Sequence, residues 1–369
     1  MQIQPLLAMQ TCGCVITSKN IIKSNNMNIC HVNLASGYHG GENQTLQLIK
    51  QQVKLGYQLT VVANPKSPFA DAVKALGVKA VLANHFTKAH SKSITKDCAL
   101  IHVHEGRAIY WALIQHMLYG KPYIVTRRID NALKKKWLAN LAYSKASAVV
   151  GLSTEIVQRV KDAYPTSVTY KIPSSPVTYP ANAETVQAIK DRFSGKFIVI
   201  HGANMLKHKG FNITVDAARL LEKSAPFVHF CLLGDGSERQ TLESQAKGLT
   251  NISFEGKQSN MGDWFAAANL QVHPSYTEGL GSVILEGMGS GLPVIGTNAG
   301  GIPDIIDHNS NGLLVEPGNA QELANAIMKI AQDEKLQQEF IANGQEKLKL
   351  FDINYTANQY VDVYEKVLR

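Results

Sequence analysis

The sequence predicts an α/β protein made of two doubly wound domains. The chain has 369 residues, which is long for one domain and ample for two. Short apolar strands alternate with helical segments along most of it, a pattern typical of parallel sheets covered by helices on both faces. Prolines between residues 164 and 180 interrupt this alternation once, near the middle. We therefore expect an N-terminal domain at residues 27–178, a C-terminal domain at 179–350 and a last segment at 351–369.

The composition indicates a globular protein and disfavours several other classes. With 45% hydrophobic and 18% charged residues, the chain is neither disordered nor fibrous. No apolar run approaches the roughly 20 residues that a membrane-spanning helix needs. Residues 1–26 lack the basic start and apolar centre of a secretory signal, and we expect a disordered tail or a misassigned start there. Cys12 and Cys14 could begin a metal site, but no second pair follows, and reduced cytoplasmic thiols are the simpler interpretation.

The first half of the chain begins with an apolar strand at residues 28–34, a glycine-rich turn at 36–42 and a helix at 44–53. The turn does not match G-x-G-x-x-G, so by itself it does not predict a dinucleotide site. The alternation then continues to the prolines. We expect strands at 58–62, 100–103, 123–126 and 148–151, and helices at 69–76, 107–118 and 154–162.

Two histidines lie at the C-terminal end of the strand expected at 100–103, where parallel sheets bind ligands. Strand alternation puts His102 and His104 on the same face of the sheet. They could be a metal pair, although no third ligand is apparent. A purely structural role for a histidine at a strand end is equally open.

The net charge of +8 is unevenly distributed, because residues 1–180 hold 21 Lys and Arg against 7 Asp and Glu. Such asymmetry indicates that the basic half meets an anionic partner. The densest basic run comprises Arg127, Arg128, Lys134, Lys135 and Lys136. Trp137 and further apolar residues follow it, which suits an anionic lipid or glycan surface. A solvated basic face is the alternative, and nucleic acid is disfavoured because no recognition motif accompanies the charge.

The second half repeats the alternation after a linker helix at residues 181–193. We expect strands at 197–201, 229–233, 252–254, 270–273, 294–296 and 313–315, and helices at 211–221, 238–246 and 263–268. More helices follow, ending with one at 355–368 whose apolar stripe is explained by core packing.

One stretch of the second half predicts a ligand site. The strand at 270–273 leads into a turn, Glu278-Gly279-Leu280-Gly281, that opens directly into a helix. Bare backbone N–H groups and a helix N-terminus together suit a phosphate or diphosphate. Glu278 at the turn and Glu286 within the helix can accept hydrogen bonds from sugar and ribose hydroxyls. Phosphate donors beside two such carboxylates describe a nucleotide-sugar site.

The same stretch resembles a known family. HPSYTEGLGSVILEGMGSGLPVI, followed by GGIPDII, is similar to the E-x7-E signature of the family 4 retaining glycosyltransferases. That family has the two-domain GT-B fold and includes lipopolysaccharide-core and phosphatidylinositol glycosyltransferases. The alternative to a nucleotide-sugar site is an ordinary strand–turn–helix crossover in which the two glutamates are solvated and have no ligand.

The resemblance implies roles for residues outside the signature. It places Gly40 and Gly41 near the donor diphosphate and the acceptor, and His104 near the reacting sugar. Lys209, in a Lys-Gly pair, matches the lysine that faces the diphosphate. An arginine usual in the family is replaced here by Ala203 or Asn204, which makes Lys207 a candidate second cation.

Further donor contacts are implied at Gly234 and around the base at Gly256 and Lys257. The family also implies that the last helix crosses back onto the first domain.

The resulting hypothesis is a retaining, metal-independent glycosyltransferase without a cofactor. Lys209 and the N–H groups of residues 279–281 would stabilise the leaving diphosphate, Glu278 and His104 would hold the sugar, and Glu286 the ribose. No D-x-D occurs in the chain, so a carboxylate-bound metal is not indicated.

The donor expected is a UDP-sugar. The acceptor expected is a cell-envelope glycan or lipid-linked molecule, met in the cytoplasm or at the cytoplasmic face of the inner membrane. A nucleotide-sugar epimerase and a catalytically silent binding protein on the same fold remain alternatives. An NAD-dependent dehydrogenase is disfavoured because the chain has no proper fingerprint.

Overall fold

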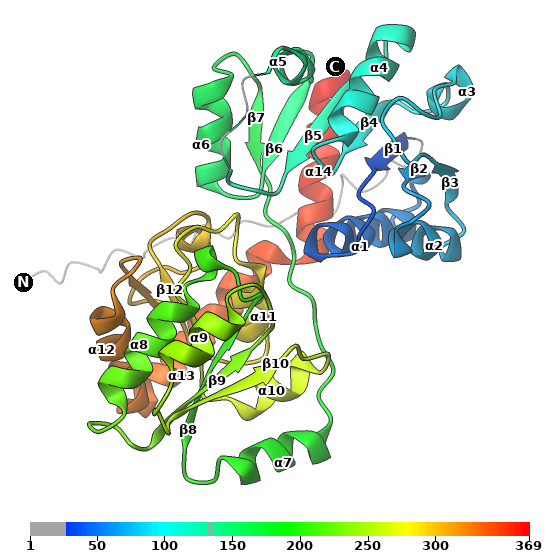
Figure 1. The fold of residues 1–369 in the computed structure, drawn as a ribbon. Coiled ribbons are helices and arrows are strands. Elements are labelled where there is room, and N and C mark those ends of the chain that lie inside the picture. The colour runs from blue at the N-terminus through cyan, green and yellow to red at the C-terminus, as the bar shows by residue number, and fades with distance from the viewer. Residues whose placement is uncertain (1–26, 132, 134–135) are drawn as a thin grey trace, which may run out of the picture.

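The chain folds into two parallel sheets, each covered by helices, in domains that lie one above the other (Figure 1). The structure is a computed structural model that describes residues 27–131, 133 and 136–369. The first sheet has the order β3-β2-β1-β4-β5-β6-β7, and the second β10-β9-β8-β11-β12-β13. All strand pairs within them are parallel. The predicted fold of two doubly wound domains is therefore confirmed.

The strands of both sheets are short. In the first domain they are β1 Asn28–Asn33, β2 Gln58–Ala63, β3 Lys79–Leu82, β4 Leu100–Val103, β5 Tyr123–Arg127, β6 Ala148–Gly151 and β7 Thr169–Lys171. In the second they are β8 Phe197–Gly202, β9 Val228–Leu233, β10 Ile252–Gly256, β11 Leu270–His273, β12 Val294–Thr297 and β13 Leu313–Val315. Both strand orders change direction beside their first strand, so ligand crevices are expected beyond the ends of β1 and β4 and of β8 and β11.

Helices connect nearly all of these strands. The first domain contains α1 Gly40–Lys54, α2 Pro68–Ala75, α3 Lys92–Thr95, α4 Ala108–Tyr119, α5 Trp137–Ser144 and α6 Thr154–Ala163. After it come α7 Ala183–Arg192, α8 Phe211–Leu221, α9 Arg239–Gln245, α10 Met261–Ala267, α11 Ser282–Gly289, α12 Ala320–Ala331, α13 Glu334–Leu348 and α14 Ile353–Leu368, with single 3₁₀ turns η1 Lys207–Lys209, η2 Ile302–Asp304 and η3 Lys349–Phe351. Among the described helices, none is long and apolar enough to cross a bilayer.

Local sequence signals fix several helix starts. Ser67 accepts a hydrogen bond from the N–H of Phe69, and Pro68 supplies the fixed φ of a first helical position. Glu42 accepts a hydrogen bond from the N–H of His39, which closes a capping box. This box lets α1 begin at Gly40, four residues before the start predicted from periodicity.

Four elements of the first domain were not predicted: β3, α3, α5 and β7. Strand β7 has only three residues and β3 four, and neither contains a fully buried residue. Edge strands of this kind lack the continuous apolar run that marks a buried parallel strand. Helix α5 directly follows the basic run, and the sequence pattern in this region indicates a charged surface and predicts no helix.

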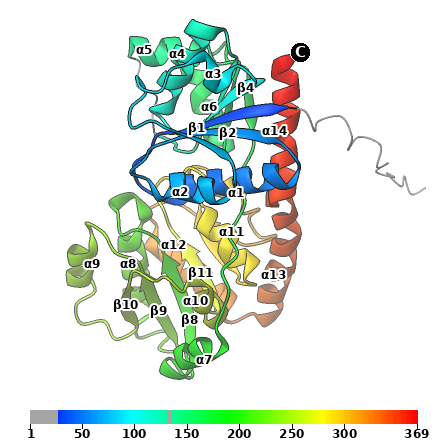
Figure 2. The same ribbon diagram turned by 90° about the vertical axis from the view of Figure 1, so that its right-hand side faces the viewer.

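The last helix belongs to the core of the first domain. Tyr360, Val363 and Tyr364 of α14 are buried in the same apolar cluster as Ile29 of β1 and Ile49 of α1. Figure 2 shows α13 against the second domain and α14 continuing upward along the first. Packing of α14 therefore links the two domains through the end of the chain.

Candidate active site

A cleft of about 580 Å³ lies between the two domains, beyond the C-terminal ends of both sheets. The first domain lines it with the start of α1 and the segment after β5. The second domain lines it with the segments that follow β8, β9, β10 and β11. The cationic side chains of this lining, within the described ranges, are Arg128, Lys209 and Lys257.

The turn before α11 faces the cleft with its backbone. Leu280, Gly281 and Ser282 line the cleft, and Gly281 is the N-cap of α11 with a φ of 92°. Gly279 does not line it, because it packs against the other domain, where a Cβ would collide with the carbonyl oxygen of Arg128. The unpaired N–H groups and the partial positive charge of the helix N-terminus make this end of the cleft suitable for a phosphate.

Glu278 is held by two partners at the same end. Its Oε2 accepts hydrogen bonds from Lys209 Nζ at 2.5 Å and from His273 Nε2 at 2.9 Å. Burial alone would raise the pKa of Glu278, but the His273 hydrogen bond and the charge of Lys209 hold it at about 2. The carboxylate is therefore ionised and fixed in orientation before any ligand arrives.

Lys209 reaches the cleft because of the residue that follows it. Gly210 has a φ of 72°, and a Cβ there would collide with the carbonyl of Pro274. This close approach places Lys209 beside Glu278. Lys207, the other predicted cation, lies instead at a separate cavity of about 670 Å³ with His208 and Tyr276.

Glu286 lies on α11 and also lines the cleft. Burial raises its pKa from 4.5 to about 8. Tyr179, from the linker between the domains, lines the same region, and burial followed by the charge of Glu286 raises its pKa to about 12. Both predicted carboxylates thus face one cleft, but one is ionised and the other is protonated at neutral pH.

The predicted glycine positions are mostly at the cleft. Gly40, Gly41 and Gly234 line it, as does Lys257. Gly256 does not, but its carbonyl accepts a hydrogen bond from the N–H of Gly234 at 2.7 Å and so supports the wall.

Arg128 is not on the outer surface, contrary to the prediction of an exposed basic face. It lines the cleft, and its guanidinium donates to Ser174 Oγ at 3.1 Å and Thr45 Oγ1 at 3.5 Å. Its Nε is buried without a partner, and burial lowers its pKa. A buried cation with a free donor suits an anionic ligand better than a bilayer surface.

The other members of the basic run lie elsewhere. Arg127 is half-buried and donates to Tyr143 Oη at 3.5 Å, and Lys136 is exposed. Lys134 and Lys135 lie outside the described residues, as does the expected tail at 1–26.

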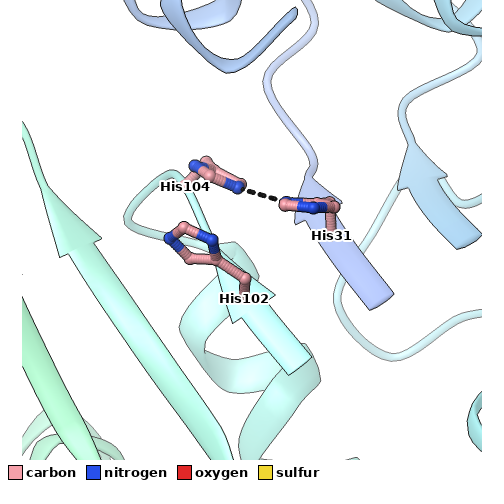
Figure 3. Close-up of side chains that lie close together, drawn as sticks. All are labelled: His31, His102 and His104. Atoms are coloured by element: carbon pink, nitrogen blue, oxygen red, sulfur yellow. Dashed lines mark hydrogen bonds between the residues drawn. The ribbon is translucent and has the colours of Figure 1, made fainter. Parts of the chain in front are cut away.

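His104 lies in a buried cluster of three histidines (Figure 3). Its Nε2 forms a hydrogen bond of 2.8 Å with His31 Nδ1, and its Nδ1 has no partner. The third member is His102, whose ring centroid is 3.9 Å from that of His104. Burial lowers the pKa of each ring, so all three are neutral at pH 7. His31, on β1, is the third histidine that the sequence did not reveal, because only the parallel pairing of β1 and β4 brings it close.

Two polar contacts made by residues outside the cleft lining join the domains. The hydroxyl of Thr277 donates to Asp130. Asp304 accepts hydrogen bonds from the N–H of Thr154 at 2.6 Å and from Lys171 Nζ at 2.8 Å. Thr277 follows β11 and Asp304 ends η2, so both contacts join the region from β11 to η2 to the first domain.

Sequence reasoning missed His273, Tyr179 and the cleft position of Arg128. His273 ends an apolar strand directly before Pro274, a strand-end signal like that of His104. Arg128 follows β5 in the same way. Tyr179 precedes Pro180 in the linker and gave no usable signal.

The C-terminal half of the chain matches a known family. Residues 182–347 match the family described as "Glycosyl transferases group 1". The N-acetyl-alpha-D-glucosaminyl L-malate synthase of Bacillus anthracis is 32% identical over 176 residues, which cover 47% of this chain and 46% of the relative. The lipopolysaccharide core biosynthesis glycosyltransferase LpsD of Rhizobium meliloti is 31% identical over 174 residues, covering 46% of this chain and 50% of the relative. The chain thus spans about half the length of these relatives.

The whole fold resembles that of solved structures. The Anabaena protein Alr3699/HepE in complex with UDP superimposes with a TM-score of 0.81 over 92% of this chain and 100% of its own, at 21% identity. A complex of the same protein with UDP-glucose gives 0.78 over 92% of this chain and 100% of its own, at 22% identity. At this level of identity the comparison shows the two-domain fold.

Proposed function

We propose that the whole chain moves a sugar from a nucleotide sugar to an acceptor, with retention at the anomeric carbon. The match of residues 182–347 to the group 1 glycosyl transferases supports this proposal. The observation that carries this proposal is the placement of Glu278 and Glu286. Both line one cleft, on either side of the N-terminus of α11, and Lys209 lies beside the first of them. A nucleotide sugar bound there would have its sugar near Glu278, its diphosphate at the N-terminus of α11 and its ribose near Glu286.

The diphosphate would lie at the N-terminus of α11. Lys209 and the backbone N–H groups of Gly281 and Ser282 would stabilise the charge that develops on the leaving phosphate. Arg128 brings a further cation from the opposite domain, with one donor still free. It is our candidate for the cation that replaces the arginine absent at Ala203.

Retention would follow from attack on one face of the sugar. The acceptor hydroxyl forms its bond to the anomeric carbon as the bond to the diphosphate breaks. The leaving phosphate takes the acceptor proton on that same face. Lys209 is oriented by Glu278 for this step, and closure of the cleft would limit reaction with water.

The donor we propose is a UDP-sugar, bound without a metal or cofactor. Glu286 would accept hydrogen bonds from the ribose, and Gly234 and Lys257 would lie toward the base. The HepE complexes with UDP and UDP-glucose support this choice, since their fold is shared over almost the whole chain.

The acceptor we propose is a cell-envelope glycan or lipid-linked molecule at the cytoplasmic face of the inner membrane. The relationship to LpsD supports it. So do exposed apolar side chains on two helices of the first domain that contact each other, namely Met117 and Leu118 of α4 and Trp137 of α5, at 65%, 58% and 75%. Exposed apolar side chains beside Lys136 suit an anionic bilayer. Nucleic acid is not proposed as a partner.

The two alternatives make different predictions. An epimerase would consume the nucleotide sugar without any acceptor. A silent binding protein would bind it and leave it intact. The ionised Glu278 and its paired Lys209 favour a working enzyme.

A thermal-shift screen of nucleotide sugars on the wild type and on Glu286→Ala tests the proposal, because a bound ligand raises apparent stability by mass action. We expect a UDP-sugar to stabilise the wild type and not the variant. The stabilising donor is then incubated with and without envelope lipids and glycans, and labelled sugar is followed. No stabilising nucleotide sugar, or consumption that needs no acceptor, would contradict the proposal.

A further inference from the structure

The second cavity, of about 670 Å³, has no part in the proposed transfer reaction, and all the residues that line it belong to the second domain. It lies against the 3₁₀ turn η1 and the helices α8 and α9, which are neighbours in the fold (Figure 1). Its volume is within the roughly 300–1,000 Å³ that is typical of small-molecule sites. We therefore asked which ligand its lining suits.

The floor of this cavity is apolar and already packed. Phe211 of α8 and Leu242 of α9 line it, and both side chains are buried. They belong to one hydrophobic cluster with Leu232 of β9, which joins the two helices to the sheet. The floor is therefore formed before any ligand binds.

One wall is an exposed tyrosine that is held in place. Tyr276 is 40% exposed, its N–H donates to the carbonyl of His208 at 2.8 Å, and its hydroxyl accepts a hydrogen bond from Asn212 Nδ2 at 3.0 Å. Its ring passes so close to Gly318 that a Cβ at that glycine would lie 3.4 Å from it. A ring fixed in this way offers an apolar face to a ligand at little cost in conformational entropy.

The rim carries polar side chains that the protein does not use itself. Lys207, Glu238 and Thr241 all line the cavity. Within the part of the chain that the structure describes, their side chains form no hydrogen bond and no ion pair. The cavity thus presents one cationic donor, one anionic acceptor and one hydroxyl that both donates and accepts.

Two further groups at the cavity each keep one hydrogen-bonding position open. The Nε2 of Gln245 donates to the carbonyl of Asn212 at 3.0 Å and to Asp216 Oδ1 at 2.8 Å, which leaves its Oε1 as an acceptor. The hydroxyl of Tyr276 accepts from Asn212 and so keeps its own proton to donate. Donors and acceptors are therefore mixed along the lining.

This mixture discriminates between ligand classes. An anion would be attracted by Lys207 but repelled by the unpaired carboxylate of Glu238. A wholly apolar ligand would cover Lys207, Glu238 and Thr241 without pairing them, which costs free energy. A neutral ligand with many hydroxyl groups meets neither penalty, because hydroxyls donate and accept and its C–H faces pack on the ring of Tyr276.

We propose that the second cavity binds neutral sugar units of a glycan, with one sugar ring packed on Tyr276 and its hydroxyls bonded to Glu238, Thr241 and Lys207. The site is separate from the inter-domain cleft, because Lys207 lines the second cavity whereas Lys209, in the same turn, lines the cleft. The turn η1 is thus a wall that the two cavities share. This binding site rests on its own lining and does not depend on the proposed reaction.

For the proposed enzyme, the consequence is a second point of attachment for a glycan acceptor. A chain that occupies both the cleft and the second cavity is retained by the effective concentration of its bound part. Long acceptors therefore gain apparent affinity, and acceptors too short to reach both places do not. This consequence, unlike the binding itself, rests on the proposed function.

The binding test uses the whole protein and a panel of neutral trisaccharides of glucose, galactose, mannose or N-acetylglucosamine, without any nucleotide sugar. Fluorotyrosine is incorporated, and the ¹⁹F signal of Tyr276 is assigned by its loss in Tyr276→Phe. We expect at least one trisaccharide to shift this signal saturably. The same titration with saturating UDP should give the same shift, because UDP is expected in the cleft.

Variants measured by calorimetry test the residues that carry the proposal. Tyr276→Ala should weaken trisaccharide binding about tenfold, and Glu238→Ala about fivefold, as for loss of a packed ring and of one charge-assisted hydrogen bond. Tyr355→Ala is the matched control, because Tyr355 is an exposed tyrosine of α14, and it should change the Kd by less than about twofold. Glu238→Ala carries the test if Tyr276→Ala does not fold, since the Glu238 side chain makes no capping bond.

A kinetic test examines the consequence for the proposed enzyme, with glycan acceptors of increasing length. In Tyr276→Ala we expect the KM of the long acceptors to rise about tenfold, while kcat and the KM of a monosaccharide acceptor stay within about twofold of the wild type. Equal effects on short and long acceptors would contradict the second point of attachment.

The proposal is overturned if no trisaccharide of the panel shifts the Tyr276 signal. It is also overturned if UDP abolishes the shift, which would place the sugar in the cleft, or if inorganic phosphate shifts the signal and the sugars do not. A wild type that binds trisaccharides at Tyr276 and transfers no sugar would instead contradict the proposed function and leave this inference in place.

Discussion

Asp304 of the second domain caps a helix of the first: its Oδ2 accepts a hydrogen bond from the backbone N–H of Thr154 at 2.6 Å. Thr154 begins α6, and its hydroxyl donates to Oδ1 of the same carboxylate at 2.7 Å. A carboxylate at a helix N-terminus satisfies an otherwise unpaired N–H and interacts favourably with the helix dipole. The contact therefore stabilises the arrangement of the two domains in this structure.

Asp304→Ala should shift the equilibrium toward an open cleft. Loss of the charge-assisted bonds is expected to cost about 1–2 kcal/mol of closure. Donor KM should rise about five- to thirtyfold, and small-angle scattering of the unliganded protein should give a larger radius of gyration. Asp307→Ala is the control, because Asp307 pairs with Lys347 within the second domain. Equal effects of the two variants would show that Asp304 acts only on the stability of its own domain.

Glu286 should make stability fall with rising pH. Its pKa is about 8 in the folded protein and near 4.5 when exposed, so between these values the folded state alone holds the proton. Stability from this group is complete below about pH 4.5 and is lost as pH rises to about 8, by at most about 1.4 kcal/mol per pH unit. Urea unfolding of Glu286→Gln should show a flatter dependence than the wild type over this range. Glu184→Gln, at an exposed position on α7, should follow the wild type.

The affinity for the donor should rise with pH, whereas the stability contributed by Glu286 falls. Ribose hydroxyls donate hydrogen bonds, which favours the ionised carboxylate over the protonated one. UDP should therefore bind more tightly as pH rises toward about 8, measured by calorimetry, and this dependence should vanish in Glu286→Gln. A pH dependence that survives in the variant would assign it to another group.

Substitution of the two lysines of the 3₁₀ turn η1 should have very different effects on kcat. Lys209 lines the cleft beside Glu278, whereas Lys207 lines a separate cavity. Lys209→Met should lower kcat about 10²–10³-fold, the usual cost of removing a group that stabilises developing charge. Lys207→Met should change kcat by less than about twofold. A comparable loss in both would restore the donor role that the sequence resemblance gave to Lys207.

The sequence predicted the fold because apolar periodicity reports burial, and both sheets are buried by helices on each face. It brought Glu278, Glu286, Lys209 and the turn before α11 into one region because these residues follow strand ends of a single domain. Arg128 was placed wrongly on the surface for a physical reason. A run of basic residues shows where charge is dense along the chain, but not which member turns inward beneath α1.

The histidine cluster was out of reach for a related reason. His31 and His104 are 73 residues apart and meet only through the register of β1 with β4, in which His31 lies opposite His102. The other partner of His31 is Gln52, a residue type without a motif. Parallel pairing predicts that strand ends meet, but it does not predict which side chains form hydrogen bonds there.

The exposed apolar surface at α4 and α5 should bind anionic bilayers. Trp137 is 75% exposed and directly follows the exposed Lys136, and a tryptophan side chain of this kind inserts at the headgroup level. Trp137→Ser should reduce pelleting with anionic vesicles several-fold at about 0.1 M salt, where charge attraction is still felt. Phe227→Ser, at an exposed aromatic position of the second domain, should leave it unchanged. Pelleting that is the same for neutral and anionic vesicles, or insensitive to salt, would show that the basic charge of this domain attracts a soluble acceptor instead of a membrane.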